Sequence, residues 1–113
     1  RIVETLVFRQ LRGLLEHMGL QAPADGRNLG YVRTAGKEVD FAFVGHAGPV
    51  LVEVTSSDGA QGKIKGVSAV AQSIGAVRAN VIHTGTHQAE TDGVSVIPLH
   101  RFLLDPTVVL GKA

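Results

Sequence analysis

Two acidic residues interrupt segments that otherwise have the composition of buried β-strands. Asp40 lies within EVDFAFV at 38–44, and Glu53 lies within VLVEVT at 50–55. Both segments are rich in Val and Phe, and the turn-forming sequence at 46–49 between them favours a β-hairpin. Because burying an ionised carboxylate without a counter-charge is costly, Asp40 and Glu53 mark a candidate cation site.

Side-chain alternation predicts where these carboxylates point. Successive strand residues face opposite sides of a sheet, so the apolar side chains share one face and the acidic ones the other. We expect Asp40 and Glu53 to lie close together on neighbouring strands. Converging carboxylates suit Mg²⁺, which prefers oxygen ligands and keeps several waters. The alternative is an acidic pair that faces solvent.

Other segments supply the elements that would position these strands. Apolar residues recur at helical spacing in 1–20 and 63–77. Further strands are predicted at 30–34, 79–84 and 94–97, and a short helix at 98–104. The order α-β-β-β-α-β-β-α predicts the α/β class, with a mixed central sheet flanked by helices. We expect one core beneath both long helices, made by Val39, Phe41, Phe43, Val50, Val52 and Val54 with Leu11, Leu14, Val67 and Val70.

Composition limits the classes of function. A chain of 113 residues with 44% hydrophobic content predicts one domain over 1–113. The net charge of +1 argues against a generally basic surface, but allows a local basic groove. No apolar run approaches the roughly 20 residues of a membrane-spanning helix. The absence of Cys excludes thiolate ligands. Because Arg1 begins within a helical pattern, without Met or a signal-like segment, we expect a domain from a longer protein.

Short motifs lie in a characteristic order along nearly the whole chain. They are Glu4 in the first helix, YVR at 31–33, KEVDF at 37–41, VEV at 52–54, GVSVIPL at 93–99 and FL at 102–103. This arrangement resembles the PD-(D/E)XK nuclease-like superfamily. It resembles more closely the uncharacterised domain that ends many prokaryotic AAA-type ATPases. The resemblance implies a restriction-endonuclease-like αβββαβ core in the C-terminal part of a longer protein.

The resemblance also implies a metal-dependent phosphodiesterase site. Asp40 and Glu53 would bind Mg²⁺ or Mn²⁺ together with the main-chain carbonyl of Val54, and Glu4 would be a further ligand, directly or through water. Such a cation lowers the pKa of a bound water and neutralises charge in the transition state. From the residues alone, Glu4 is equally well explained as a solvated residue near a helix start, favoured by the helix dipole.

Thr55 departs from the superfamily pattern, in which active members usually carry Lys at this position. General acid–base assistance is typically worth about 10²–10⁴-fold in rate, so the loss predicts a weakened catalyst. Lys63, Lys65 or Lys37 could supply the missing cation, and we include Lys63 with the catalytic candidates. Each of these lysines is also explained as an ordinary surface residue.

Three functions follow from this reading. The first is a nuclease-like domain that acts on or binds DNA. The second is a noncatalytic docking module of a larger AAA-type ATPase, and the third a self-association module of that ATPase. The expected partners are DNA, the ATPase domain of the parent chain and a second copy, in the cytoplasm and without a membrane. Gln72, His83 and His87 are weaker signals, and no phosphate-binding loop indicates ATP hydrolysis within this chain.

Overall fold

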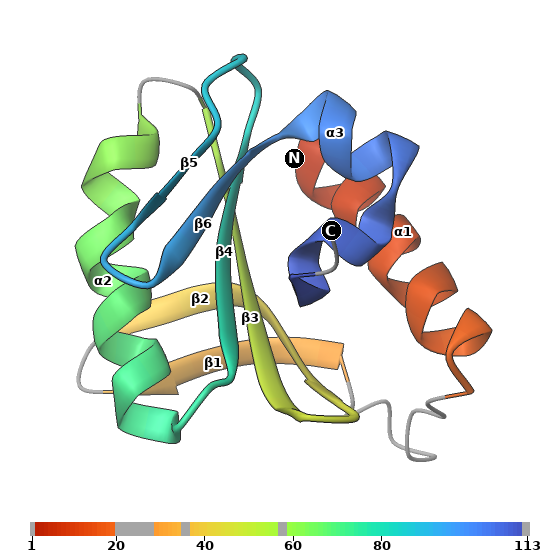
Figure 1. Cartoon of the computed structure of the whole chain (residues 1–113), viewed down its shortest axis with the longest axis horizontal. Coiled ribbons are helices and arrows are strands. Elements are labelled where there is room, and N and C mark those ends of the chain that lie inside the picture. Colours follow the sequence, from red (N-terminus) through yellow and green to blue (C-terminus); the bar gives the residue numbers. More distant parts are fainter. Residues whose placement is uncertain (1, 20–28, 35–36, 57–58, 112–113) are drawn as a thin grey trace.

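Six strands form one mixed sheet that is covered by helices on both faces (Figure 1). The structure is a computed structural model that describes residues 2–19, 29–34, 37–56 and 59–111. Its elements are α1 (Ile2–His17), β1 (Leu29–Thr34), β2 (Lys37–Gly45), β3 (Gly48–Thr55), α2 (Ala60–Ile74), β4 (Arg78–His83), β5 (Ala89–Thr91), β6 (Val94–Pro98), α3 (Leu99–Leu104) and the 3₁₀ helix η2 (Pro106–Leu110). The predicted α/β class and its αβββαβ order are confirmed.

The strand order in the sheet is β1-β2-β3-β4-β6-β5. The first three strands form an antiparallel meander, β3, β4 and β6 are parallel, and β5 returns antiparallel to β6. The carboxyl ends of the three parallel strands therefore meet at one edge of the sheet, where α2 and α3 connect. Strand β5 lies within a segment that the sequence analysis did not assign to a strand.

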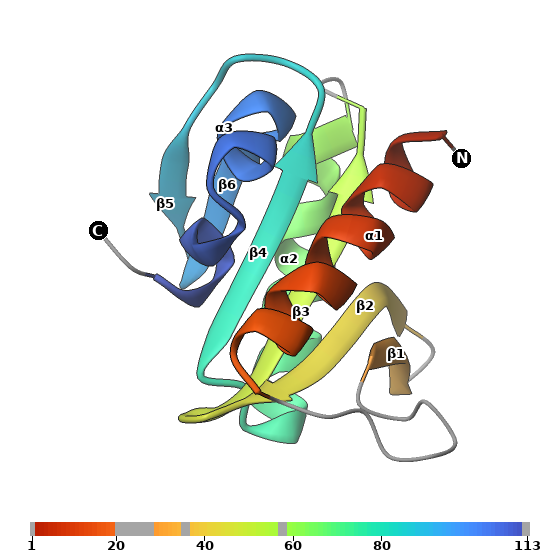
Figure 2. The same cartoon turned by 90° about the vertical axis from the view of Figure 1, so that its right-hand side faces the viewer.

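The two long helices cover opposite faces of the sheet, so the expectation of one core beneath both is wrong. Figure 2 shows α1 in front of β3 and α2 behind the sheet. The α1 side buries Val7, Leu11, Leu14, Leu15, Phe43, Val50, Val52, Val54, Ile82, Ile97, Phe102 and Val109. The α2 side buries Val39, Leu51, Ala60, Ile64, Val67, Val70, Ala79, Val81, Val94 and Val96. A parallel centre needs cover on both faces because both carry apolar side chains.

A break in the register of β2 moves Val39 to the α2 side. Gly30 of β1 pairs with Ala42, but Val32 pairs with Val39, so β2 holds one extra residue in this interval. An extra residue reverses the alternation of every side chain beyond it. The expectation that Val39 shares a face with Phe43 is therefore wrong, and the bulge falls at Asp40.

The C-terminal elements are tied to the sheet by a buried amide. Asn80 of β4 is fully buried, and its Nδ2 donates to the carbonyl oxygens of Leu51 and Val109, each at 3.0 Å. These bonds join β3, β4 and η2, which packs with α3 on the α1 side. None of the described helices has both the length and the apolar character that crossing a membrane requires.

Candidate functional site

Asp40 and Glu53 face each other where the hairpin of β2 and β3 opens. The last paired residues at this end of the ladder are Phe41 and Val52. At the next position the main-chain N–H of Asp40 donates to Glu53 Oε1 at 2.9 Å, and the N–H of Val54 donates to Asp40 Oδ2 at 2.9 Å. Side chains thus replace main-chain carbonyls as acceptors, and both carboxylates are held between the two strands.

The bulge explains why this occurs at Asp40. An extra residue bends its strand and re-aims a side chain, which is a common arrangement next to functional sites. Here it turns the Asp40 carboxylate toward β3. The sequence predicted that Asp40 and Glu53 lie together on neighbouring strands, and the structure places them so.

Burial dominates the electrostatics of the pair. Glu53 is only 4% exposed and Asp40 is partly buried. Desolvation is the largest effect on each and raises the pKa of both carboxyl groups above their ordinary values. The hydrogen bond from Val54 opposes this rise in the pKa of Asp40, and the bond from the Asp40 N–H opposes it for Glu53. The site therefore favours any cation that neutralises the pair.

Lys63 supplies one such cation from the first turn of α2. Its Nζ lies 3.1 Å from Glu53 Oε2, and its side chain is 48% exposed while that of Glu53 is 6% exposed. The hydrogen bond to Glu53 is the largest of the effects that raise the pKa of Lys63. The ammonium therefore stays charged, and it lies at the solvent side of the buried carboxylate.

Thr55 and Gly59 bring α2 close enough for this ion pair. A Cβ atom added at Gly59 would overlap Thr55 Oγ1, so the N-cap of α2 lies directly against the end of β3. Gly59 and Lys63 are four residues apart and therefore lie on one side of the helix start. The close approach that needs glycine at 59 also directs Lys63 toward Glu53. A side chain longer than that of Thr at position 55 would have to extend past Gly59.

The donor atoms suit a small, hard cation. The two main-chain N–H groups bond to Asp40 Oδ2 and Glu53 Oε1, and Lys63 contacts Glu53 Oε2. In an extended strand the N–H and C=O of one residue point to the same side, so the Val54 carbonyl faces the side of Asp40. Two carboxylates, one carbonyl and waters are an acceptable shell for Mg²⁺.

Glu4 contributes charge to this site. Its negative charge raises the pKa of Asp40. Glu4 also lines the same hollow as Phe41, the residue next to Asp40 in β2. Within the described residues, however, no group of three or more His, Asp or Glu side chains is arranged to hold a metal ion. The structure therefore brings Asp40 and Glu53 together without joining Glu4 to them as a third ligand. Its role as a ligand stays a prediction.

The other lysines and Gln72 are less well placed. Lys65 and Gln72 are exposed on α2, and neither contacts the carboxylates. The side chain of Lys37 lies outside the described residues. Of the three lysine candidates, Lys63 is the one that the structure places at Glu53. The sequence had no means to rank them, because the ranking depends on how α2 packs against β3.

His83 has a structural role at the end of β4. The N–H of Gly85 donates to His83 Nδ1 at 3.1 Å, which leaves Nε2 as the protonated nitrogen, and this donates to the His87 carbonyl at 2.6 Å. Both ring nitrogens are therefore occupied by the turn that follows β4. The His83 ring is fully buried and organises this turn.

Sequence reasoning missed the polar group on the opposite edge of the sheet. Arg78, Glu90 and Ser95 come from three strands, and the Arg78 Nη2 lies 3.1 Å from Glu90 Oε2, which also accepts from the Ser95 hydroxyl. The local signal was Ser95, a polar residue within the apolar strand predicted at 94–97. Compared with known proteins, the chain matches no family model, no curated protein and no solved structure.

Proposed function

We propose that this chain is a metal-dependent, nuclease-like domain that acts on phosphodiester bonds of DNA and is weakened by Thr55. The observation that carries the proposal is the 3.1 Å contact between Lys63 Nζ and Glu53 Oε2. It supplies a lysine at the carboxylate pair from α2 instead of from position 55. The resemblance to the PD-(D/E)XK superfamily and the adjacent pair of carboxylates support the same function.

Asp40 and Glu53 would hold Mg²⁺ or Mn²⁺ together with the carbonyl of Val54. A bound divalent cation supplies Lewis-acid stabilisation of phosphate charge and lowers the pKa of a water ligand. The two carboxyl groups must be ionised to bind it, and their hydrogen bonds to the main chain keep them in place when they are. These bonds spare the site the reorganisation that a mobile pair of side chains would need.

Lys63 would act as a charge stabiliser and not as a general base. Its pKa is raised by Glu53, so the side chain is an ammonium with protons to donate and no free lone pair. The half-exposed ammonium of Lys63 would be able to turn toward a phosphate oxygen or an attacking water once Glu53 had another positive partner. We expect slow cleavage, because the Lys63 ammonium must leave Glu53 before it can contact the phosphate.

A cleavage assay tests the proposal. Supercoiled plasmid, linear duplex and single-stranded DNA are incubated with Mg²⁺ or Mn²⁺ and with wild type, Asp40→Asn, Lys63→Met, Lys65→Met and Thr55→Lys. We expect slow cleavage that is abolished by Asp40→Asn, lost or greatly reduced by Lys63→Met and unaffected by the matched control Lys65→Met. Cleavage that survives Asp40→Asn would refute the site. Cleavage seen only with Thr55→Lys would identify a noncatalytic relative.

A docking function is the second candidate, and an apolar hollow at the start of α1 favours it. The hollow has a volume of about 590 Å³ and is lined by Ile2, Leu6, Phe8 and Phe41 among others. Ile2 is 79% exposed and Leu6 is 39% exposed. Exposed apolar side chains beside a hollow are typical of interaction surfaces. Their partner would be the ATPase domain of a cytoplasmic, prokaryotic parent protein, or a second copy of this chain.

Light scattering after gel filtration separates these partners. A mass that doubles for wild type and is halved by Leu6→Glu supports self-association. A monomer that binds the isolated ATPase domain only when Leu6 is intact supports docking to the parent. A monomer that binds neither would remove this second candidate.

A further inference from the structure

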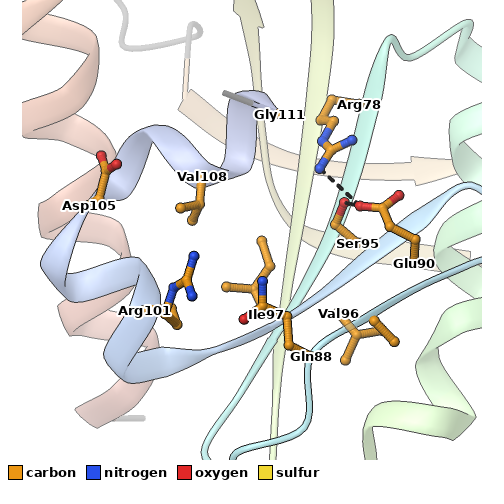
Figure 3. A pocket seen from close by; sticks show the side chains of 11 residues that line it. Arg78, Gln88, Glu90, Ser95, Val96, Ile97, Arg101, Asp105, Val108 and Gly111 are labelled. Carbon is orange, nitrogen blue, oxygen red and sulfur yellow. Dashed lines mark hydrogen bonds and ion pairs between the residues drawn. The ribbon is translucent and has the colours of Figure 1, made fainter. Parts of the chain in front are cut away.

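A second pocket lies on the other side of the molecule and shares no residue with the carboxylate site. It has a volume of about 460 Å³ and lies between the β5–β6 edge of the sheet and the C-terminal elements α3 and η2. Figure 3 shows the guanidinium groups of Arg78 and Arg101 on two sides of this pocket, with Ile97 between them and Val108 on the side of Arg101. The volume is within the range of small-molecule sites, which runs from roughly 300 to 1,000 Å³.

Arg101 brings to the pocket an exposed guanidinium whose donors are unpaired among the described residues. Within the described part of the chain its guanidinium makes no hydrogen bond or ion pair, although it carries five N–H donors. Asp105 also lines the pocket but does not pair with Arg101. Asp105 is instead the N-cap of η2, and its Oδ1 accepts from the N–H and the hydroxyl of Thr107. The N–H donors of Arg101 therefore remain available to a ligand.

Arg78 has donors to spare as well. Its Nη2 bonds to Glu90 Oε2, but its Nε is buried and has no hydrogen-bond partner among the described residues. Gly111 packs against the guanidinium so closely that an added Cβ would lie 3.2 Å from Cζ. The backbone of Gly111 therefore lies directly beside the guanidinium. A buried donor without a partner is unusual in folded proteins, so the Nε of Arg78 is a donor that a bound group could satisfy.

Glu90 shows the kind of group that this pocket accepts. Its carboxylate is 62% exposed on the rim, and one of its oxygens meets both Arg78 and the Ser95 hydroxyl. Arg78 and Ser95 thus form a recess for an oxyanion, and Glu90 fills it from the edge. Arginine binds carboxylates and phosphates with two parallel N–H bonds, which makes both groups suitable ligands.

We propose that this pocket is a binding site for a small organic anion, with an oxyanion head held by Arg101 and Arg78 and an apolar body against Ile97 and Val108. Two carboxylates balance two arginines among the lining residues, so the pocket has no net excess of charge. The proposal therefore rests on the positions of the Arg101 and Arg78 donors and not on a net positive charge. The shared chemistry is the oxyanion, which a carboxylate or a phosphate provides equally.

The test is an NMR titration of the ¹⁵N-labelled 113-residue chain at constant ionic strength. The probes are inorganic phosphate, phenyl phosphate and benzoate, with chloride as the reference. We expect saturable shifts confined to amides of Arg78, Ser95, Ile97, Arg101 and Gly111, and tighter binding of the two aromatic probes than of inorganic phosphate. Preference for phenyl phosphate or for benzoate identifies the natural head group as phosphate or carboxylate. Shifts scattered over all basic residues, or no saturable shift with any probe, would overturn the proposal.

Matched variants sharpen the result. Arg101→Gln should weaken binding about tenfold, the usual worth of a charge-assisted hydrogen bond, while Arg9→Gln on α1 makes the same charge change and should have no effect. Glu90→Gln should tighten binding because it releases Arg78, whereas Glu16→Gln should not. Opposite directions for Arg101→Gln and Glu90→Gln cannot arise from unfolding alone. Equal effects of the pocket variants and their controls would reduce the site to nonspecific charge attraction.

Discussion

The N–H of Asp40 and the carboxylate of Glu53 form a 2.9 Å hydrogen bond at the point where the β2–β3 ladder stops. In return, the Asp40 carboxylate accepts the N–H of Val54. Each acidic side chain thus satisfies a main-chain donor of the opposite strand, and both carboxylates are fixed beside each other without a metal. The same residues therefore stabilise the fold and form the candidate site.

This double role separates two substitutions at Asp40. Asp40→Ala leaves the N–H of Val54 without an acceptor and should lower the free energy of unfolding by about 1–3 kcal/mol. Asp40→Asn keeps a carbonyl oxygen there and should change stability much less. Both should lose Mn²⁺ binding. Urea unfolding in EDTA and calorimetric titration with Mn²⁺ measure the two effects, and equal stability of the two variants would contradict the role assigned to the Val54 bond.

Lys63 should matter more than its neighbour Lys65. Lys63→Met leaves the buried Glu53 without its counter-charge. Because Lys63 is half exposed and solvent screens the pair, we expect a loss of about 1–2 kcal/mol, well below the 3–5 kcal/mol of fully buried pairs. Lys65→Met removes an equal charge from the same helix and should be nearly neutral. Urea unfolding of both variants at pH 7 checks this, and similar losses would show that the ion pair contributes nothing.

The raised pKa values of Asp40 and Glu53 predict an unusual pH dependence. A group whose pKa is higher in the folded state adds stability below its unfolded pKa and loses it as the pH rises through the folded pKa. The pH then rises from the ordinary pKa values of 3.8 and 4.5 through the raised values. Over this interval the free energy of unfolding of the metal-free chain should fall relative to that of Glu53→Gln. Unfolding of the two proteins between pH 3 and 8 measures the difference. A difference of the opposite sign would show that the carboxylates are stabilised as anions.

Metal affinity should increase over the same pH interval. The proposed site would bind Mn²⁺ through ionised carboxylates, so its affinity should rise as the pH passes the raised pKa values and should reach its plateau at a higher pH than an exposed carboxylate site does. At alkaline pH, the raised pKa of Lys63 means that its ammonium should lose a proton only above the ordinary value of 10.5. The ion pair with Glu53 should be lost in that range. Titrations of Mn²⁺ at several pH values test the first part. Affinity that is constant from pH 4 to 8 would exclude these carboxylates as ligands.

Gly59 and Thr55 should be coupled. Gly59→Ala places a methyl group into Thr55 Oγ1 and should destabilise the chain by about 1–3 kcal/mol, the usual cost of overpacking. Thr55→Ala removes the overlapping oxygen, so the double variant should recover most of that loss. A double-mutant cycle from urea unfolding gives the coupling energy. Additive losses would mean that α2 adjusts its position freely, and Lys63 would then not be directed by this contact.

The sequence by itself determined the elements other than β5 and η2, the α/β class and the proximity of Asp40 and Glu53. These features follow from local patterns: helical spacing in 1–20 and 63–77, and Val-rich runs separated by turn residues. Burying an ionised carboxylate within such a strand costs free energy, whichever position the strand has in the sheet. The candidate site was therefore visible before the positions of its neighbours were known.

Tertiary structure decided which face each strand residue occupies. Strict alternation placed Val39 with Phe43, but the extra residue in β2 reverses the pattern at Asp40. This bulge depends on how β2 pairs with β1 and β3 together, which no single segment encodes. Similarly, β3 is buried on both faces, so its run of apolar residues gave no sign that α1 and α2 lie on opposite sides.

The packing of α2 against β3 also determines which lysine lies at Glu53. Lys37, Lys63 and Lys65 were equivalent as sequence features, because each is a cation at a predicted strand or helix start. The contact of Gly59 with Thr55 sets how closely α2 approaches β3, and this distance brings Lys63 to Glu53 while Lys65 faces solvent. The pocket between Arg78 and Arg101 arises in the same way. Its residues are distant in sequence and meet only because β4, β6 and α3 come together in the folded chain.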